Sequence, residues 1–97
     1  MRGTLKKIKI GKKHVTALNL PLQSKKLIVL RGKHGYVMCG YLNLKVSEKF
    51  GDVGVKIVGV SSIANAISAS VHSCTSAAKK LGIKKGQPVK DVLEKIA

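Results

Sequence analysis

The segment KLIVLRGKHGYVMCGYL, residues 26–42, decides how the sheet of this chain begins. Its first part, Lys26–Leu30, contains the short apolar run Leu-Ile-Val-Leu, which is typical of a buried strand. Arg31–Gly35 follows with two glycines, which can take the positive φ angles of a hairpin loop. Tyr36–Leu42 is then the returning strand. The segment therefore predicts an antiparallel hairpin.

The flanking segments extend this hairpin in both directions. Towards the N-terminus, Thr4–Ile10 is predicted to be an edge strand whose lysines keep it from pairing with another chain, and His14–Leu20 is the next strand. Towards the C-terminus, Asn43–Phe50 is predicted to be a short helix that Asn43 caps. Val53–Val60 follows as a buried strand with glycines that allow another backbone to approach.

Three further helices are predicted in the last third of the chain. Ser61–Ser62 caps the first of them. Val71–Leu81 is the second, and Gly82 fits the position that closes such a helix. Pro88 begins the last helix, where its missing N–H costs nothing. That helix has the clearest apolar face, formed by Val89, Val92, Leu93 and Ile96.

Strands gathered first and helices later indicate an α+β fold. We expect a mostly antiparallel or mixed sheet of about five strands, with three to four helices packed on one of its faces. At 97 residues, the chain has the length of one domain, predicted to span residues 1–97. Aromatic residues make up only 3%, so the core must be built from Val, Ile, Leu and Ala.

The charge balance is the strongest signal in the composition. Nineteen basic residues face four acids, which gives a net charge of +15 at pH 7. Such a surface attracts polyanions through counterion release, so weak, non-specific association with nucleic acid is predicted. All basic residues except Arg2 and Arg31 are lysine, which argues against specific reading of base edges. A lysine-rich proteome, such as that of a thermophile, explains the same composition.

Several classes of protein are disfavoured. No apolar run approaches the roughly 20 residues of a membrane span, and the N-terminus lacks the pattern of a secretory signal, so we expect no membrane association and a cytoplasmic location. The two cysteines form neither a disulfide framework nor a zinc-ligand pattern. No metal site and no cofactor are predicted.

The stretch His34–Gly40 concentrates a histidine, a tyrosine and a thiol at a strand that precedes a helix. If the chain turns at Gly40, Cys39 lies near the positive end of that helix, where a thiol is activated, so Cys39 is the candidate catalytic residue. His34 lies about 16 Å away along the strand, so a Cys–His pair would need His14 or His72. Alternatively, Cys39 is a buried packing residue.

Two serines add a second feature to this candidate site. Ser61 and Ser62 precede a helix and can present backbone amides to a phosphate or carboxylate, although an ordinary helix cap is the better explanation of the same residues. Cys74 is assigned to the apolar face of the predicted helix, and so to the core. The candidate ligand-binding residues are therefore His34, Gly35, Tyr36, Gly40, Ser61 and Ser62.

The string His-Gly-Tyr-Val-Met-Cys-Gly-Tyr-Leu, residues 34–42, resembles the YunC-like family of uncharacterised bacterial and archaeal proteins, a domain of unknown function. Val58–Val60 and the helix after it are similar to that family, as is the stretch Thr75–Gly86. The resemblance extends from about Pro21 to the C-terminus. It supports the fold and implies no activity.

Three hypotheses about function therefore stay open, since the sequence reveals no specific activity. The first is a site for a small or anionic ligand, or an enzymatic site, near the 34–40 stretch. The second is a binding module that associates weakly with RNA or DNA through its lysines. The third is a structural homo-oligomer, because a mean hydropathy of +0.10 at 24% charged residues leaves apolar surface to bury.

Overall fold

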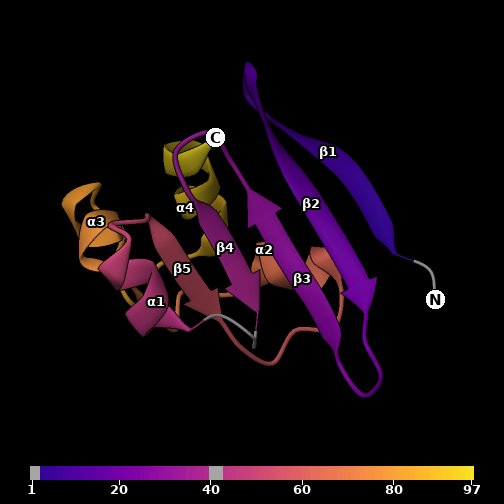
Figure 1. Ribbon diagram of the computed structural model, residues 1–97. Helices are drawn as coiled ribbons and strands as arrows, with labels where there is room; N and C mark the ends of the chain where they lie inside the picture. The colour runs from indigo at the N-terminus through magenta and orange to yellow at the C-terminus, as the bar shows by residue number, and fades with distance from the viewer. Residues whose placement is uncertain (1–2, 40–42) are drawn as a thin grey trace.

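Six strands form one mixed sheet in the order β1-β2-β3-β4-β5-β6 (Figure 1). The computed structural model describes residues 3–39 and 43–97. The sheet has one strand more than the five expected, because the two-residue strand β6 extends it at the edge. The strands are β1 (Thr4–Ile10), β2 (Lys13–Pro21), β3 (Lys26–Arg31), β4 (Tyr36–Cys39), β5 (Gly54–Ile57) and β6 (Ser73–Cys74).

The alternation of strand direction is broken once across the sheet. Every neighbouring pair is antiparallel except β4 and β5, which are parallel. A parallel pair needs a connection that crosses from one end of the sheet to the other, and α1 (Leu44–Lys49) lies within that connection. The other helices are α2 (Ile63–Ser68), α3 (Ser76–Lys80) and α4 (Val89–Ile96). The α+β class expected from the sequence is confirmed.

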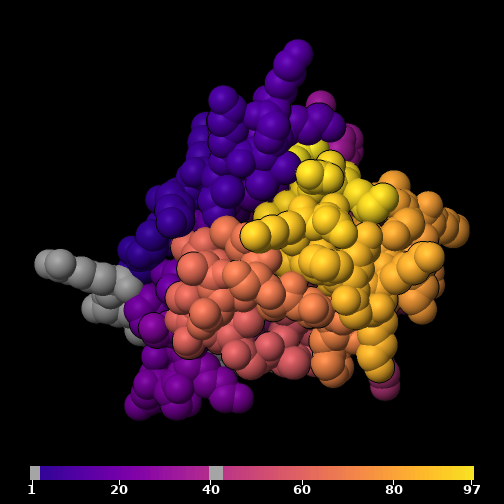
Figure 2. Space-filling model, turned by 180° about the vertical axis from the view of Figure 1, so that it is seen from behind, coloured from indigo at the N-terminus to yellow at the C-terminus, as the bar shows by residue number. Residues whose placement is uncertain are grey.

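The helices lie on both faces of the sheet, whereas the sequence predicts them on one face only. Helices α2 and α4 pack side by side and cover one face (Figure 2). Helix α1 lies on the opposite face, over β5 (Figure 1). Gly54 of β5 makes this possible, since a Cβ there would lie 3.3 Å from the Cβ of Ser47 in α1.

One hydrophobic core lies between the sheet and the layer of α2 and α4. Alternate strand residues point into it, as expected of a sheet with one buried face. The strands contribute Val15, Ala17, Ile28, Leu30, Val37, Cys39, Val55 and Ile57, and the helices contribute Ile63, Ala66, Ala78, Val89, Val92, Leu93 and Ile96.

The helix predicted over Val71–Leu81 is shorter than expected. The chain is extended as β6, and helix α3 begins only after Thr75, whose hydroxyl accepts a hydrogen bond from the N–H of Ala78. The same hydroxyl donates to the carbonyl of Asp52 at 2.7 Å and accepts from the N–H of Gly54 at 3.1 Å. Thr75 is thus tied to the strand edge, which holds the preceding residues extended. Cys74 therefore lies in β6 and not on a helix.

Several local predictions are confirmed at the ends of elements. Asn43 caps α1, Ser62 caps α2, and Gly82, with φ +90°, closes α3. Strand β5 ends earlier than predicted, because Gly59 takes a φ of +71° and turns the chain. Pro88 is the cap that precedes α4 rather than its first residue. Within the described ranges, no helix combines the length and the apolar character that crossing a membrane requires.

The glycines of the β3–β4 loop serve a different purpose from the one predicted. Neither Gly32 nor Gly35 takes a positive φ. A Cβ on Gly32 would instead overlap the carbonyl of Ile96, and a Cβ on Gly35 would lie 2.6 Å from the side chain of Val53. The N–H of His34 donates to the Ile96 carbonyl at 2.7 Å. Gly32 therefore allows the loop to pack against the end of α4, and Gly35 allows it to pack against Val53.

Candidate functional site

The sheet topology places the predicted site residues at two opposite ends of β4. Cys39 ends β4, and because β4 and β5 are parallel, the loop that follows β5 leaves the sheet at the same end. Strand β3 is antiparallel to β4, so Lys26, its first residue, lies at this end too. His34 precedes β4 and lies at the opposite end. The fold therefore separates Cys39 from His34 and brings Cys39 towards the loop that carries Ser61.

A hollow of about 580 Å³ opens at the Cys39 end of the sheet. We call it the Cys39 pocket. It is formed by the β2–β3 turn, the end of β4, the middle of β5 and the loop that leads to α2. Its lining residues are Ser24, Lys25, Lys26, Cys39, Lys56, Val58, Gly59, Val60 and Ser61.

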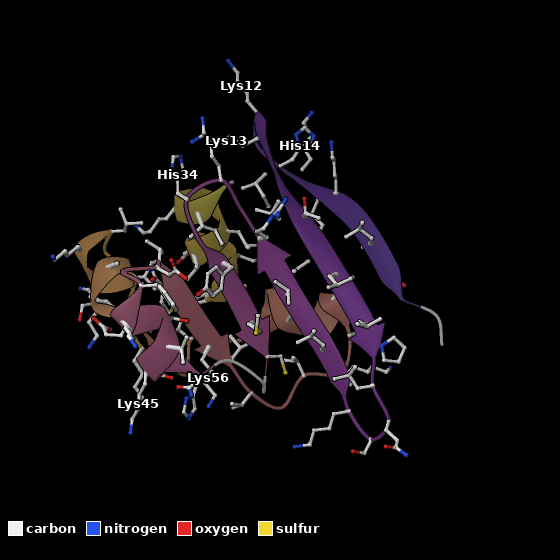
Figure 3. All side chains as sticks on the ribbon, viewed as in Figure 1. Lys12, Lys13, His14, His34, Lys45 and Lys56 are labelled. Atoms are coloured by element: carbon white, nitrogen blue, oxygen red, sulfur yellow. The ribbon has the colours of Figure 1, made fainter. Side chains whose placement is uncertain are left out.

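Three lysines converge on the Cys39 pocket from two places in the sequence. Lys25 and Lys26 come from the β2–β3 turn, which a hydrogen bond of 2.7 Å from the N–H of Leu22 to the Lys25 carbonyl closes. Lys56 comes from β5 and lies at the end of the sheet opposite His34 (Figure 3). No carboxylate is among the described residues that line it. The pocket therefore carries a local excess of positive charge.

Hydroxyl groups lie beside these charges. Ser24 and Ser61 both line the pocket, and the Ser61 hydroxyl donates to the side-chain oxygen of Asn65 at 3.1 Å. Ser62 is used as the α2 cap, because its hydroxyl accepts from the N–H of Asn65 at 3.0 Å. Of the two predicted serines, Ser61 thus faces the pocket and Ser62 serves the helix.

Cys39 forms part of the pocket wall and is only 7% exposed. Its thiol donates to the carbonyl of Val60 at 3.8 Å. His72 lies beyond β5, where its N–H donates to the Lys56 carbonyl, so two strand spacings, about 10 Å, separate it from β4. His14 is the second residue of β2 and lies at the opposite end of the sheet. The fold thus gives the Cys39 thiol a carbonyl as its hydrogen-bond partner rather than an imidazole base.

Tyr36 points to the face of the sheet opposite Cys39. Its hydroxyl lies 2.8 Å from that of Ser47 and donates to the carboxylate of Asp52 at 3.0 Å. Burial is the main cause that raises the pKa of Tyr36, and Asp52 raises it further. Tyr36 thus stays protonated at neutral pH and joins α1 to the sheet.

The remaining predicted residues lie apart from the Cys39 pocket. Gly35 packs against Val53, and Gly40 falls outside the described residues. His34 is exposed and lies with the β1–β2 hairpin (Figure 3). We call this group the hairpin-end cluster: Lys12, Lys13, His14, Lys33 and His34. Within residues 3–39 and 43–97, no three His, Cys, Asp or Glu side chains group as metal ligands.

Sequence reasoning missed the three lysines of the pocket. One signal for Lys56 was present, because it is the only charged residue in the apolar run Val53–Val60. Lys25 and Lys26 carried no such signal, since lysine pairs recur along the whole chain.

Comparisons with known proteins found a matching family and similar proteins to which no function is assigned. The model of a family described as "Domain of unknown function (DUF1805)" matches residues 38–96, which include Cys39, Lys56 and Ser61. The "Uncharacterized protein YunC" of Bacillus subtilis (strain 168) is 34% identical over 85 residues, 84% of either chain. The crystal structure of a protein of unknown function, TA1206, from Thermoplasma acidophilum has a TM-score of 0.95 at 33% identity. That match covers 99% of this chain and 94% of the other.

Proposed function

Because this chain belongs to the DUF1805 family, whose description assigns no activity, we propose a function from the site itself: binding of a small anionic ligand in the Cys39 pocket. The observation that carries this proposal is the convergence of Lys25, Lys26 and Lys56 on one hollow whose described lining residues include no carboxylate. Its volume of about 580 Å³ lies in the range of small-molecule sites.

The pocket chemistry favours a phosphate or carboxylate group. A lysine ammonium is a compact charge with three donors, which suits an anion without demanding one orientation. The hydroxyl of Ser24 adds a neutral donor at the same hollow, and the Ser61 hydroxyl, which donates to Asn65, adds an acceptor. Val58 and Val60 offer apolar contact to the rest of the ligand.

Binding is better supported than catalysis. A cysteine nucleophile needs a neighbouring base or a lowered pKa, and the hydrogen-bond partner of Cys39 is the Val60 carbonyl. Cys39 is thus proposed to shape the pocket wall. Two free thiols, Cys39 and Cys74, also fit a reducing compartment, which supports a cytoplasmic location.

The test is a titration of the full chain, followed by amide NMR, with glucose 6-phosphate and with glucose as the neutral control. We expect glucose 6-phosphate to shift the signals of Cys39, Lys56 and Ser61, and glucose to leave them unchanged. Lys56→Met keeps the aliphatic stem and removes the charge, so it should weaken binding about fivefold or more.

The matched control is Lys90→Met, which alters an exposed lysine of α4. It should leave the dissociation constant unchanged. Equal losses in both variants, or shifts spread evenly over the lysine surface, would show diffuse charge attraction and refute the pocket.

A second candidate function is weak association with nucleic acid through the hairpin-end cluster. Lys13, His14, Lys33 and His34 line one hollow of about 270 Å³, and Arg31 lines the neighbouring one. Two loops thus offer cations to a phosphate backbone at one end of the sheet. Sequence-specific reading is not expected, because Tyr36, which could stack on a base, is engaged with Ser47 and Asp52.

Fluorescence anisotropy with a random RNA tests this second candidate. Binding should be measurable at about 50 mM salt and fall by about 10³-fold or more at about 200 mM if six or more phosphates are contacted. Replacing Lys13 and Lys33 with Gln should weaken it more than replacing Lys84 and Lys85. Tight binding of one sequence at the higher salt, lost in Tyr36→Ala, would contradict this view.

A further inference from the structure

A continuous row of apolar side chains crosses the sheet on the face opposite α2 and α4, which we call the open face. The strand register pairs Leu5 with Leu18, Leu18 with Val29, and Val29 with Met38. Residues directly opposite one another on neighbouring strands point to the same face, so these four side chains adjoin. Lys56 is the partner of Met38 and ends the row on β5.

The β1 end of this row is exposed, and its other side chains, Leu18, Val29 and Met38, are half-buried. Of the described elements, α1 alone packs on the open face, and it lies over β5 rather than over β1–β3. Leu5 is 71% exposed, and Val46 of α1 is 48% exposed. Between α1 and the row lies a hollow of about 440 Å³, lined mainly by apolar atoms that include those of Val29, Met38 and Val46. The second layer on this face is thus incomplete.

Positive charges border the apolar row on one side. The adjacent row joins Lys7 of β1 to Thr16 and Arg31, and the row beyond it joins Lys9 to His14. The acids lie elsewhere or are engaged: Asp52 accepts from Tyr36, Glu48 accepts from Ser76, and Asp91 and Glu94 belong to α4 on the other face. The open face therefore combines an apolar strip with a cationic border.

A second copy of the chain does not complement this surface. It would bring the same cations against the open face, and each copy carries a net charge of +15. A partner must instead supply an apolar strip together with carboxylates. The four apolar side chains lie on four neighbouring strands and span about 14 Å, which equals the length of a helix of about 10 residues.

We propose that the open face binds an acidic amphipathic helix of a partner protein, which lies beside α1 and completes the layer that α1 begins. The helix places its apolar side chains on Leu5, Leu18, Val29 and Met38 and its carboxylates near Lys7 and Arg31. This site is distinct from the Cys39 pocket, which contains none of these six residues.

The probe is a synthetic helical peptide of roughly 16 residues, with Leu along one face and Glu on the other. The control peptide has the same Leu residues and Lys in place of Glu. Amide NMR of the full chain should show shifts along the row for the Glu peptide and none for the Lys peptide. Arg31→Gln should weaken Glu-peptide binding and reduce its dependence on salt.

The decisive variant is Leu5→Gln, because so exposed a side chain is replaced without loss of core packing. It should weaken Glu-peptide binding about tenfold, as expected for an interface anchor. Leu81→Gln is the matched control: this leucine is 43% exposed but belongs to the end of α3, so binding should be unchanged.

Four results would overturn the proposal. The Glu peptide fails to shift the row, or both peptides bind equally, or Leu5→Gln and Leu81→Gln weaken binding alike. The fourth is a different occupant. Sedimentation showing a dimer that Leu5→Gln dissociates would assign the face to self-association. Phosphatidylglycerol vesicles that retain the chain only when Leu5 is intact would assign it to a lipid surface.

Discussion

The two thiols have different surroundings although both are free. Cys39 borders a hollow that three lysines line, and Cys74 lies half-buried in β6 with its thiol donating to the Ile83 carbonyl at 3.7 Å. Burial raises the pKa of Cys74, so less of it is thiolate at neutral pH. The local charge should therefore give the two thiols different rates of reaction with a charged reagent.

Alkylation by negatively charged iodoacetate and by neutral iodoacetamide measures the effect of that charge on each thiol. The ratio of the two alkylation rates, iodoacetate over iodoacetamide, should be higher at Cys39 than at Cys74, and Lys56→Met should lower it at Cys39 only. Peptide mass spectrometry of timed samples measures both rates. Ratios that are equal at the two sites would mean that the lysines do not act on the pocket wall.

The raised pKa of Tyr36 predicts how the free energy of unfolding depends on pH. Tyr36→Phe removes the bonds to Ser47 and Asp52 and leaves the buried Ser47 hydroxyl without this partner, so it should cost about 1–3 kcal/mol at pH 8. A pKa that is raised by folding stabilises the protein below the ordinary tyrosine pKa of about 10, and this contribution is lost as pH rises through the folded value. Urea unfolding from about pH 8 to 11 should show the two proteins converging. A difference in the free energy of unfolding that stays constant over this pH range would contradict the role assigned to the Tyr36 hydroxyl.

At the scale of elements, α4 is the clearest test of packing. Leu93 is 1% exposed and contributes to the core between α4 and the sheet. Leu93→Ala should therefore lower the free energy of unfolding by about 2–5 kcal/mol. Lys90→Ala, on the exposed side of the same helix, should change it by less than about 0.5 kcal/mol. Equally mild effects in denaturant titrations would mean that α4 is not docked.

Elements were predictable where a local pattern determines them. Asn43 and the spacing of Val89, Val92, Leu93 and Ile96 identify α1 and α4 without tertiary information. The prediction of one helix over residues 71–81 is wrong. Its helical spacing is overridden by the hydrogen bonds of Thr75 to Asp52 and Gly54, which are distant in sequence.

The candidate site was predictable only in part for the same reason. Cys39 and Ser61 stand out as a motif and a cap, and they do line one pocket. The lysines that give the pocket its charge come from the β2–β3 turn and from β5, and only the pairing of the strands brings them together. The sequence predicts the hairpin of β3 and β4, but it contains no signal for the parallel pairing of β4 with β5 that brings Lys56 to the same end.

For the molecule as a whole, the +15 charge governs both stability and association. Repulsion between lysines destabilises the folded state and is screened by salt, while attraction of anions is weakened by the same screening. Sodium chloride raised from about 20 to about 300 mM should thus increase the melting temperature of the free protein and lower its affinity for RNA.

Calorimetry at several salt concentrations checks the first effect. A variant with Lys84 and Lys85 changed to Gln should show a smaller dependence of the melting temperature on salt, because it has less repulsion to screen. An unchanged or falling melting temperature in the parent protein would show that specific chloride or ion-pair effects outweigh the general repulsion.

The single parallel pair in the sheet bears on the order in which the chain folds. Strands β1–β4 pair with their neighbours in sequence through short turns, so their contacts close small loops early. The pairing of β4 with β5 requires the crossover that contains α1, so we expect it to form later, and we expect α4, which follows all the strands in the sequence, to dock after the sheet has formed. In stopped-flow kinetics, Ile28→Val in β3 should chiefly slow refolding, whereas Leu93→Ala in α4 should chiefly accelerate unfolding.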